Sequence, residues 1–114
     1  MRNGGAWAWA GQRFTGLLVA GFLGAHLWFA HLTELGQRIT LERVTERLGT
    51  GGFFFLYIVL LAAAMYHALY GVRGVVLDYG LGERGKALAT WLFVLIGAAG
   101  FSWGSSTLFY FLFR

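Results

Sequence analysis

The chain contains no cysteine in its 114 residues, and it contains no proline. Without cysteine, the polypeptide forms no disulfide bond and ligates no iron–sulfur cluster through thiolates. Any iron bound by this chain must therefore be held by histidine, of which the sequence has three. No nucleophile, phosphate-loop or metal-hydrolase pattern is visible. The alternating glycines of residues 80–85 follow an apolar run rather than a Rossmann strand, which is typical of a turn.

Charged residues are also scarce. They make up 12% of the chain, against 58% hydrophobic residues, and the mean hydropathy is +0.63. A soluble domain of this size carries about twice that share of charge. Three windows, near residues 14–34, 52–77 and 87–112, are apolar enough and long enough to cross a bilayer, which takes about 20 helical residues. We therefore expect an all-α membrane protein with three transmembrane helices, forming one domain over residues 1–114 with no soluble catalytic module.

The net charge of +4 needs no nucleic-acid partner, because basic residues on membrane loops account for it and no nucleic-acid motif accompanies them. The basic residues are nearly balanced between the two sides of the membrane, with Arg2, Arg13, Arg73, Arg84 and Lys86 on the amino-terminal side and Arg38, Arg43, Arg47 and Arg114 on the other. This slight excess favours a cytoplasmic amino terminus. Arg13 follows Trp7 and Trp9 without a cleavage pattern, so we expect the first helix to be retained rather than removed as a signal peptide.

The segment between the first two windows has the pattern of a short amphipathic helix. Leu41, Val44 and Leu48 fall on one helical face, Thr40 is a suitable N-cap, and Gly49 suits the C-terminal stop. The Glu and Arg residues of the segment form a solvated face at the membrane surface. We expect a structural role for this helix.

His67 lies inside the second window, near its end. Ionisable groups inside a membrane are costly and usually face a bundle interior, a partner or a cofactor. Small or short side chains recur around His67 at helical spacing, at Ala63, Ala64, Gly71, Gly74 and Asp78. Such a face either leaves space for something flat and large or lets another helix approach closely.

The motif from Tyr66 to Gly80 gives this histidine a more specific meaning. His67, followed by Gly71, Arg73 and the pair Asp78 and Tyr79, closely resembles the second-helix motif of the hydrophobic anchor subunits of succinate dehydrogenase and fumarate reductase, respiratory complex II. The resemblance implies that His67 ligates haem b and that the Asp-Tyr end lies at the quinone site. It makes a porphyrin the favoured occupant of the small-residue face.

A second histidine, His26, lies in the first window. At 1.5 Å per residue, His26 is about 12 Å below the surface near Glu34, whereas His67 is about 22 Å below the same surface. Because a bis-histidine iron needs both ligands at one depth, His26 and His67 are expected to serve different haems, each completed by a partner's histidine. This resembles the two-haem class of complex II anchors. The alternative for His26 is a buried hydrogen-bonding histidine. His31 and Arg73 are candidate contacts of haem propionates, and His31 alternatively sits at the interface.

The first window opens with residues 9–16, which resemble the His-Arg-x-Ser/Thr-Gly opening of the family's first helix. In that family the arginine, here Arg13, lies near the quinone. Gln12 replaces the usual histidine, and Trp9 stands where some members have a serine. By this resemblance Tyr79 would donate to a quinone carbonyl, Arg13 would stabilise charge developing on reduction, and Asp78 would orient Arg13 or carry protons.

The chain is thus identified as resembling a three-helix anchor subunit of complex II. The resemblance implies a membrane-anchor domain that binds one or two haem b groups, contributes to a quinone site and passes electrons to quinone, with no dicarboxylate chemistry of its own. Its partners would be a second anchor subunit, an iron–sulfur subunit, a flavoprotein subunit and membrane lipid. Two rivals remain: a non-redox membrane protein in which His67 and Asp78 form an ion path, and a complex II anchor without haem.

Overall fold

The computed structural model describes residues 3–33 and 35–113, and within them it contains helices and no strand. The elements are α1 (Asn3–Leu27), a π-helical turn η1 (Trp28–Leu32), α2 (Leu41–Leu48), α3 (Gly51–Leu77) and α4 (Glu83–Leu112). Three stretches are long and apolar enough to cross a membrane: Gly5–Leu32, Gly51–Leu77 and Glu83–Leu112. The expected all-α fold with three spanning helices and a short helix between the first and second is confirmed. Arg2, Glu34 and Arg114, used above for topology and depth, lie outside the described residues.

The first helix begins well before the predicted window. It is already helical at Asn3, eleven residues before the expected start at Phe14. Arg13 does not interrupt it, because the alanines and tryptophans ahead of Arg13 continue the apolar helix. The second and third helices match their predicted windows more closely, although α4 starts four residues early, at Glu83.

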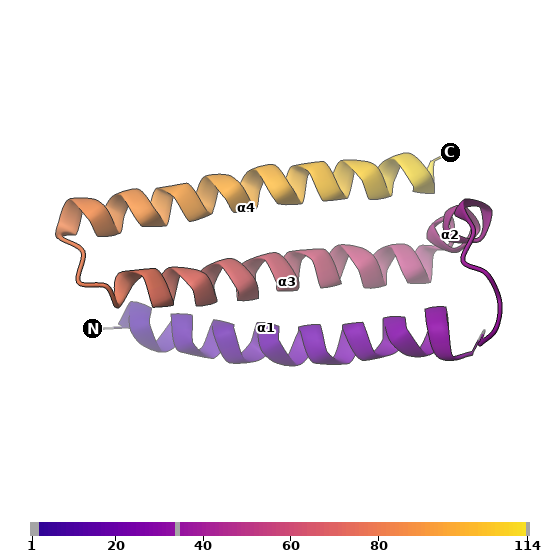
Figure 1. The fold of residues 1–114 in the computed structure, drawn as a ribbon, viewed down its shortest axis with the longest axis horizontal. Helices are drawn as coiled ribbons and strands as arrows, with labels where there is room; N and C mark the ends of the chain where they lie inside the picture. Colours follow the sequence, from indigo (N-terminus) through magenta and orange to yellow (C-terminus); the bar gives the residue numbers. More distant parts are fainter. Residues whose placement is uncertain (1–2, 34, 114) are drawn as a thin grey trace.

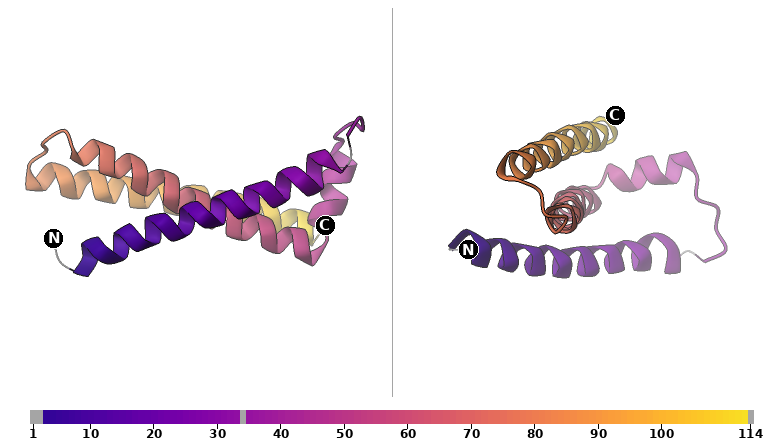
Figure 2. Two further views of the ribbon diagram at one scale, coloured as in Figure 1. Left: turned by 90° about the horizontal axis from the view of Figure 1, so that it is seen from below. Right: turned by 60° about the vertical axis from the view of Figure 1, so that its left-hand side comes forward.

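The three long helices form a row rather than a closed bundle (Figure 1). The central helix, α3, packs against α1 on one side and α4 on the other, and within the described residues α1 makes no contact with α4. In Figure 2, α1 crosses α3 obliquely while α4 runs closer to the direction of α3. Gly80, with φ of 75°, makes the turn from α3 to α4, a conformation that glycine adopts without steric cost. A row of helices leaves two broad faces for lipid or partner chains.

Little of the chain is buried within itself. Among the described residues, the buried hydrophobic side chains are Ala30, Leu48, Ala63 and Ala89, most of them small. Most large apolar side chains face outward, including Trp7, Trp91 and Trp103. Small residues let membrane helices pack closely while the large ones face the apolar surroundings.

The short helix α2 begins and ends as expected. The hydroxyl of Thr40 accepts a hydrogen bond from the backbone N–H of Arg43 at 3.2 Å, so the predicted N-cap is confirmed. Gly49 follows the last helical residue, but its φ of −70° is right-handed, so the stop does not use the left-handed conformation of glycine. Leu48 is buried against the bundle end, whereas Leu41 remains exposed.

The π-helical turn η1 continues α1 and was not predicted. The backbone N–H of Thr33 donates to the carbonyl of Trp28 at 3.0 Å, a bond spanning five residues. The wider turn brings residues five apart onto one face. It therefore places the ring of His31 beside that of His26, with centroids 5.2 Å apart.

Candidate functional site

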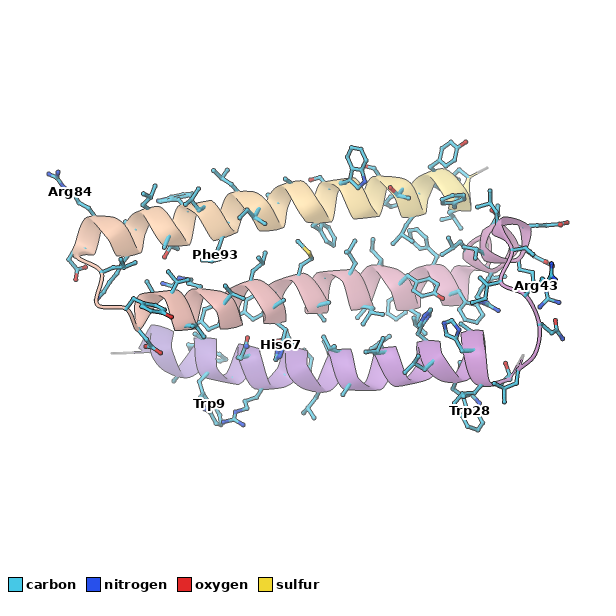
Figure 3. All side chains as sticks on the ribbon, viewed as in Figure 1. Trp9, Trp28, Arg43, His67, Arg84 and Phe93 are labelled. Carbon is cyan, nitrogen blue, oxygen red and sulfur yellow. The ribbon has the colours of Figure 1, made fainter. Side chains whose placement is uncertain are left out.

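His67 lies on the face of α3 that packs against α1 (Figure 3). Its Nδ1 is 3.2 Å from the backbone carbonyl oxygen of Gln12 and 3.4 Å from the hydroxyl oxygen of Thr15. In return, the side-chain amide of Gln12 donates to the carbonyl oxygen of His67 at 3.1 Å. Because a carbonyl oxygen only accepts, Nδ1 must carry the proton in this bond. The neutral ring then presents an unprotonated Nε2, the form in which histidine ligates a metal.

Gly16 makes room for this ring. A Cβ added at Gly16 would lie 3.2 Å from Cε1 of His67, tighter than most real contacts. A cavity of ≈ 540 Å³ opens beside the ring and is lined by Trp9, Gln12, Arg13, Gly16, Leu17 and His67. Within the described residues, Nε2 of His67 has no hydrogen-bond partner. The site thus combines an oriented imidazole, a free ligating nitrogen and an adjacent space.

These features fit a haem b ligand. Ligating histidines almost always donate their other ring nitrogen to a carbonyl or carboxylate, as Nδ1 of His67 does here. No group of three or more His, Cys, Asp or Glu side chains lies close enough to hold a metal in residues 3–33 and 35–113. Iron at His67 would therefore need the porphyrin nitrogens and an axial ligand from elsewhere.

The small-residue face around His67 is divided between two uses. A Cβ on Gly71 would lie 3.2 Å from Nε2 of Gln12, so Gly71 serves the packing of α1 on α3, and Ala63 is buried. Gly74 has no atom within 4 Å of where its Cβ would lie. Close helix packing explains part of the pattern, and open space remains toward the amino-terminal end of the bundle.

His26 and His31 form a separate group at the other end of α1. Nδ1 of His26 is 2.8 Å from the hydroxyl of Tyr57 on α3, and the two rings meet edge to face. Both histidines line a cavity of ≈ 700 Å³ that also touches α2, α3 and α4 and includes Arg47. Tyr57 precedes His67 by ten residues, which is about 15 Å along a helix. His26 and His67 therefore lie at different levels of the bundle.

The three quinone candidates lie toward one end of the bundle without touching one another. The guanidinium of Arg13 stacks on the ring of Trp9, 5.0 Å from its centroid, and Arg13 lines the His67 cavity. Asp78 caps the end of α3, and Tyr79 is 81% exposed. No hydrogen bond or ion pair links Arg13 to Asp78 or Tyr79 in the part of the chain that the structure describes.

Arg73 faces away from the His67 cavity. Its Nε donates to the hydroxyl of Thr90 on α4 at 2.9 Å, and its guanidinium lies 5.7 Å from the ring centroid of Tyr70. It lines a cavity between α3 and α4 that does not include His67. To reach a propionate of a haem at His67, Arg73 would have to leave Thr90.

Two positioning groups were missed from the sequence. Thr15 and Tyr57 both contact histidine rings, at 3.4 and 2.8 Å. A hydroxyl within an apolar helix was the available signal, because a buried polar group needs a partner. The histidine that each hydroxyl contacts depends on how α1 is rotated against α3, and the spacing of residues along the sequence does not give that rotation.

Comparison with known proteins shows the family to which the chain belongs. Residues 2–102 match the family described as succinate dehydrogenase/fumarate reductase transmembrane subunit. A succinate dehydrogenase hydrophobic membrane anchor subunit of Archaeoglobus fulgidus is 34% identical over 102 residues, which cover 90% of this chain and 86% of the relative. Proteins of the same description from Halobacterium salinarum and Thermoplasma acidophilum are 29% and 28% identical, covering 70% and 66% of this chain and 62% and 61% of their own lengths. The family match covers the first two long helices and reaches residue 102 within α4, and the chain belongs to the succinate dehydrogenase/fumarate reductase transmembrane subunit family.

Proposed function

We propose that this chain binds haem b through Nε2 of His67 and thereby takes part in electron transfer from succinate to quinone. The observation that carries the proposal is the bond from Nδ1 of His67 to the carbonyl of Gln12, which leaves Nε2 unprotonated and without a described partner. A haem bound there would supply a one-electron redox centre within the membrane. Gln12 and Thr15 hold the ring, and Gly16 keeps the space beside it free of a side chain.

His26 is proposed as the ligand of a second haem. Ligation by this ring requires Nδ1–H of His26 to donate to the Tyr57 hydroxyl oxygen, which leaves Nε2 for iron. The separation of about 15 Å along α3 between Tyr57 and His67 supports two haems at two levels over one haem with two ligands from this chain. His31, whose ring lies beside His26, is placed to contact a propionate of that haem.

A quinone site is proposed in the half of the helices that carries the amino terminus of α1 and the carboxyl end of α3, with Arg13, Asp78 and Tyr79 as contributors. Arg13 lines the same cavity as His67, so a quinone held there would lie close to the haem. The exposed Tyr79 hydroxyl would donate to a quinone carbonyl, and the Arg13 guanidinium would stabilise negative charge on the reduced ring. Asp78 and Tyr79 would complete the site from the end of α3 once a partner covers it.

The proposed partners are a second anchor subunit, the iron–sulfur subunit and the flavoprotein subunit. A second anchor is needed because three helices in a row leave the His67 cavity open on one face, and the chain offers one axial ligand at each level. The chain itself contributes no dicarboxylate chemistry. We place it in the cytoplasmic membrane of a bacterium or archaeon with its amino terminus in the cytoplasm, following the slight excess of basic residues on that side.

The experiment that tests this function uses the whole assembly, purified through a tag on this chain. Subunits are identified by mass spectrometry, and succinate is added to the oxidised sample while the haem spectrum is recorded. Succinate should reduce the haem, and quinone should reoxidise it. A colourless assembly that still reduces quinone would show an anchor without haem, and an assembly lacking the flavoprotein and iron–sulfur subunits would contradict the proposal as a whole.

A further inference from the structure

A second large cavity lies between α3 and α4. It measures ≈ 710 Å³, and its walls are largely apolar, with Leu69 on α3 and Phe93 and Gly97 on α4 among the lining residues. Phe93 points into the space between the two helices in Figure 3. Gly97 lets them approach, since a Cβ there would lie 3.1 Å from Cδ1 of Leu69. The cavity is a groove along the helices, with one charged side chain in its wall, Arg73.

Arg73 is fixed in this groove without a counter-charge. Its Nε donates to Thr90, and its guanidinium stands over the ring of Tyr70. Neither of its terminal nitrogens donates a hydrogen bond to any residue in 3–33 or 35–113, and no ion pair neutralises it there. A cation within a membrane helix is normally paired or reaches the polar interface. The groove therefore presents the uncompensated positive charge of Arg73 at one end of an apolar surface.

The depth of Arg73 suits a lipid headgroup. Arg73 precedes the last residue of α3, Leu77, by four positions, which places its Cα about 6 Å below the helix end. The arginine side chain is long enough to reach the headgroup region from this depth, and reaching it requires the guanidinium to turn away from Tyr70 and Thr90. At the same end of the helices, Arg73, Arg84 and Lys86 carry positive charges, and Asp78 and Glu83 carry negative charges. Nζ of Lys86 lies 3.8 Å from a carboxylate oxygen of Glu83. These five side chains together carry a net charge of +1.

The groove faces away from the haem site. Arg73 follows His67 by six positions, a rotation of about 240° around the helix, so the two side chains project from different sides of α3. A partner that covers the His67 cavity would leave the groove open. On the groove side, the lining residues Tyr66 and Val94 are 41% and 51% exposed.

We propose that the groove between α3 and α4 is a binding site for one anionic phospholipid, with its phosphate on Arg73 and an acyl chain along the apolar wall. From Arg73 to Ala62, the lining of α3 extends over eleven positions, about 16 Å, which is half the thickness of the hydrocarbon core. Basic pockets between membrane helices recognise anionic headgroups in this way. A partner helix would instead need a carboxylate inside the membrane to neutralise Arg73, which is costly. The site does not depend on haem.

The test measures which lipid the purified assembly retains. The assembly is washed in detergent to remove bulk lipid and incubated with equal amounts of phosphatidylglycerol and phosphatidylcholine, and the retained lipids are counted by mass spectrometry. The native assembly should retain one phosphatidylglycerol in preference to phosphatidylcholine. Arg73→Gln should reduce that preference about fivefold, the contribution of one basic side chain at the surface. Arg84→Gln removes an exposed charge outside the groove and should change the preference for phosphatidylglycerol by less than twofold.

A second variant tests the contribution of the groove's shape separately from that of the Arg73 charge. Val94→Trp fills the groove without altering any charge and should lower the retention of both lipids. Equal retention of the two lipids by the native assembly, or an unchanged preference in Arg73→Gln, would overturn the proposal. So would an assembly that retains no lipid, because a partner helix would then occupy the groove. Loss of haem from Arg73→Gln with unchanged lipid would assign Arg73 to a propionate instead.

Discussion

His67 and Gln12 are joined by two hydrogen bonds that run in opposite directions between α3 and α1. Nδ1 of His67 lies 3.2 Å from the carbonyl oxygen of Gln12, and the side-chain amide of Gln12 donates to the carbonyl oxygen of His67 at 3.1 Å. The pair fixes both the tautomer of the ring and its position between the helices. It uses the backbone of Gln12 for the first bond, so side-chain exchange at position 12 alone leaves the ring's acceptor in place.

The first prediction concerns the space beside the ring. Gly16→Val should lower the occupancy of the haem at His67 severalfold, because even the Cβ would lie 3.2 Å from Cε1 of His67 and the added methyl groups would project into the cavity. Gly21→Val is the matched control on the same helix, since no atom lies within 4 Å of its Cβ position. Haem per assembly, measured by pyridine haemochrome, should fall in the first variant only. Equal haem in both variants would remove Gly16 from the site.

The second prediction concerns His26. His26→Ala should remove one of two haems and leave the other, because His26 lies about 15 Å from the level of His67. Tyr57→Phe should keep both haems and shift the midpoint potential of the one at His26, since it removes the hydrogen bond to Nδ1. Potentiometric titration of the haem bands measures both effects. Unchanged haem content in His26→Ala would identify His26 as a hydrogen-bonding partner of Tyr57 and nothing more.

The third prediction concerns Arg13 and the quinone. Arg13→Gln should raise the KM for quinone or lower kcat severalfold while leaving haem content unchanged, because the guanidinium lines the cavity but makes no bond to His67. Trp9→Leu should weaken the same step to a lesser degree, since the Trp9 ring supports the guanidinium at 5.0 Å. Succinate-dependent quinone reduction is the assay. Loss of haem in Arg13→Gln would point to a structural role for this arginine.

The fourth prediction concerns the packing of α4 on α3. Gly104→Val should destabilise the assembly by about 1–3 kcal/mol, because the Cβ position lies 2.7 Å from Cδ2 of Leu61 and the side chains must shift. Ala99→Val adds two carbons, one fewer than Gly104→Val, on an exposed face of α4 and should have little effect. Thermal unfolding in detergent, followed by tryptophan fluorescence, compares the two. Equal midpoints would mean that the α3–α4 contact tolerates the added side chain.

The sequence predicts the spanning helices well because the bilayer imposes their length and apolar composition. It also predicts the cap at Thr40, which is a local bond within one turn. It does not predict the π-helical turn at Trp28–Leu32, nor the side of α3 from which Arg73 meets Thr90. These features depend on how three helices rotate against one another. His67 stands out as a candidate site residue from its place in an apolar run, whereas its hydrogen-bond partner Gln12 can be found only from the packed pair of helices.

A dithionite-reduced minus oxidised spectrum of the purified assembly shows whether His67 ligates a haem. Native protein, His67→Gly, and His67→Gly with added imidazole are compared, with haem quantified per assembly. The native protein should show a reducible Soret band, and His67→Gly should lose one haem. Added imidazole should restore that haem, because it replaces the missing ligand without restoring helix packing. Full haem in His67→Gly, or no haem in the native assembly, would rule out haem ligation by His67.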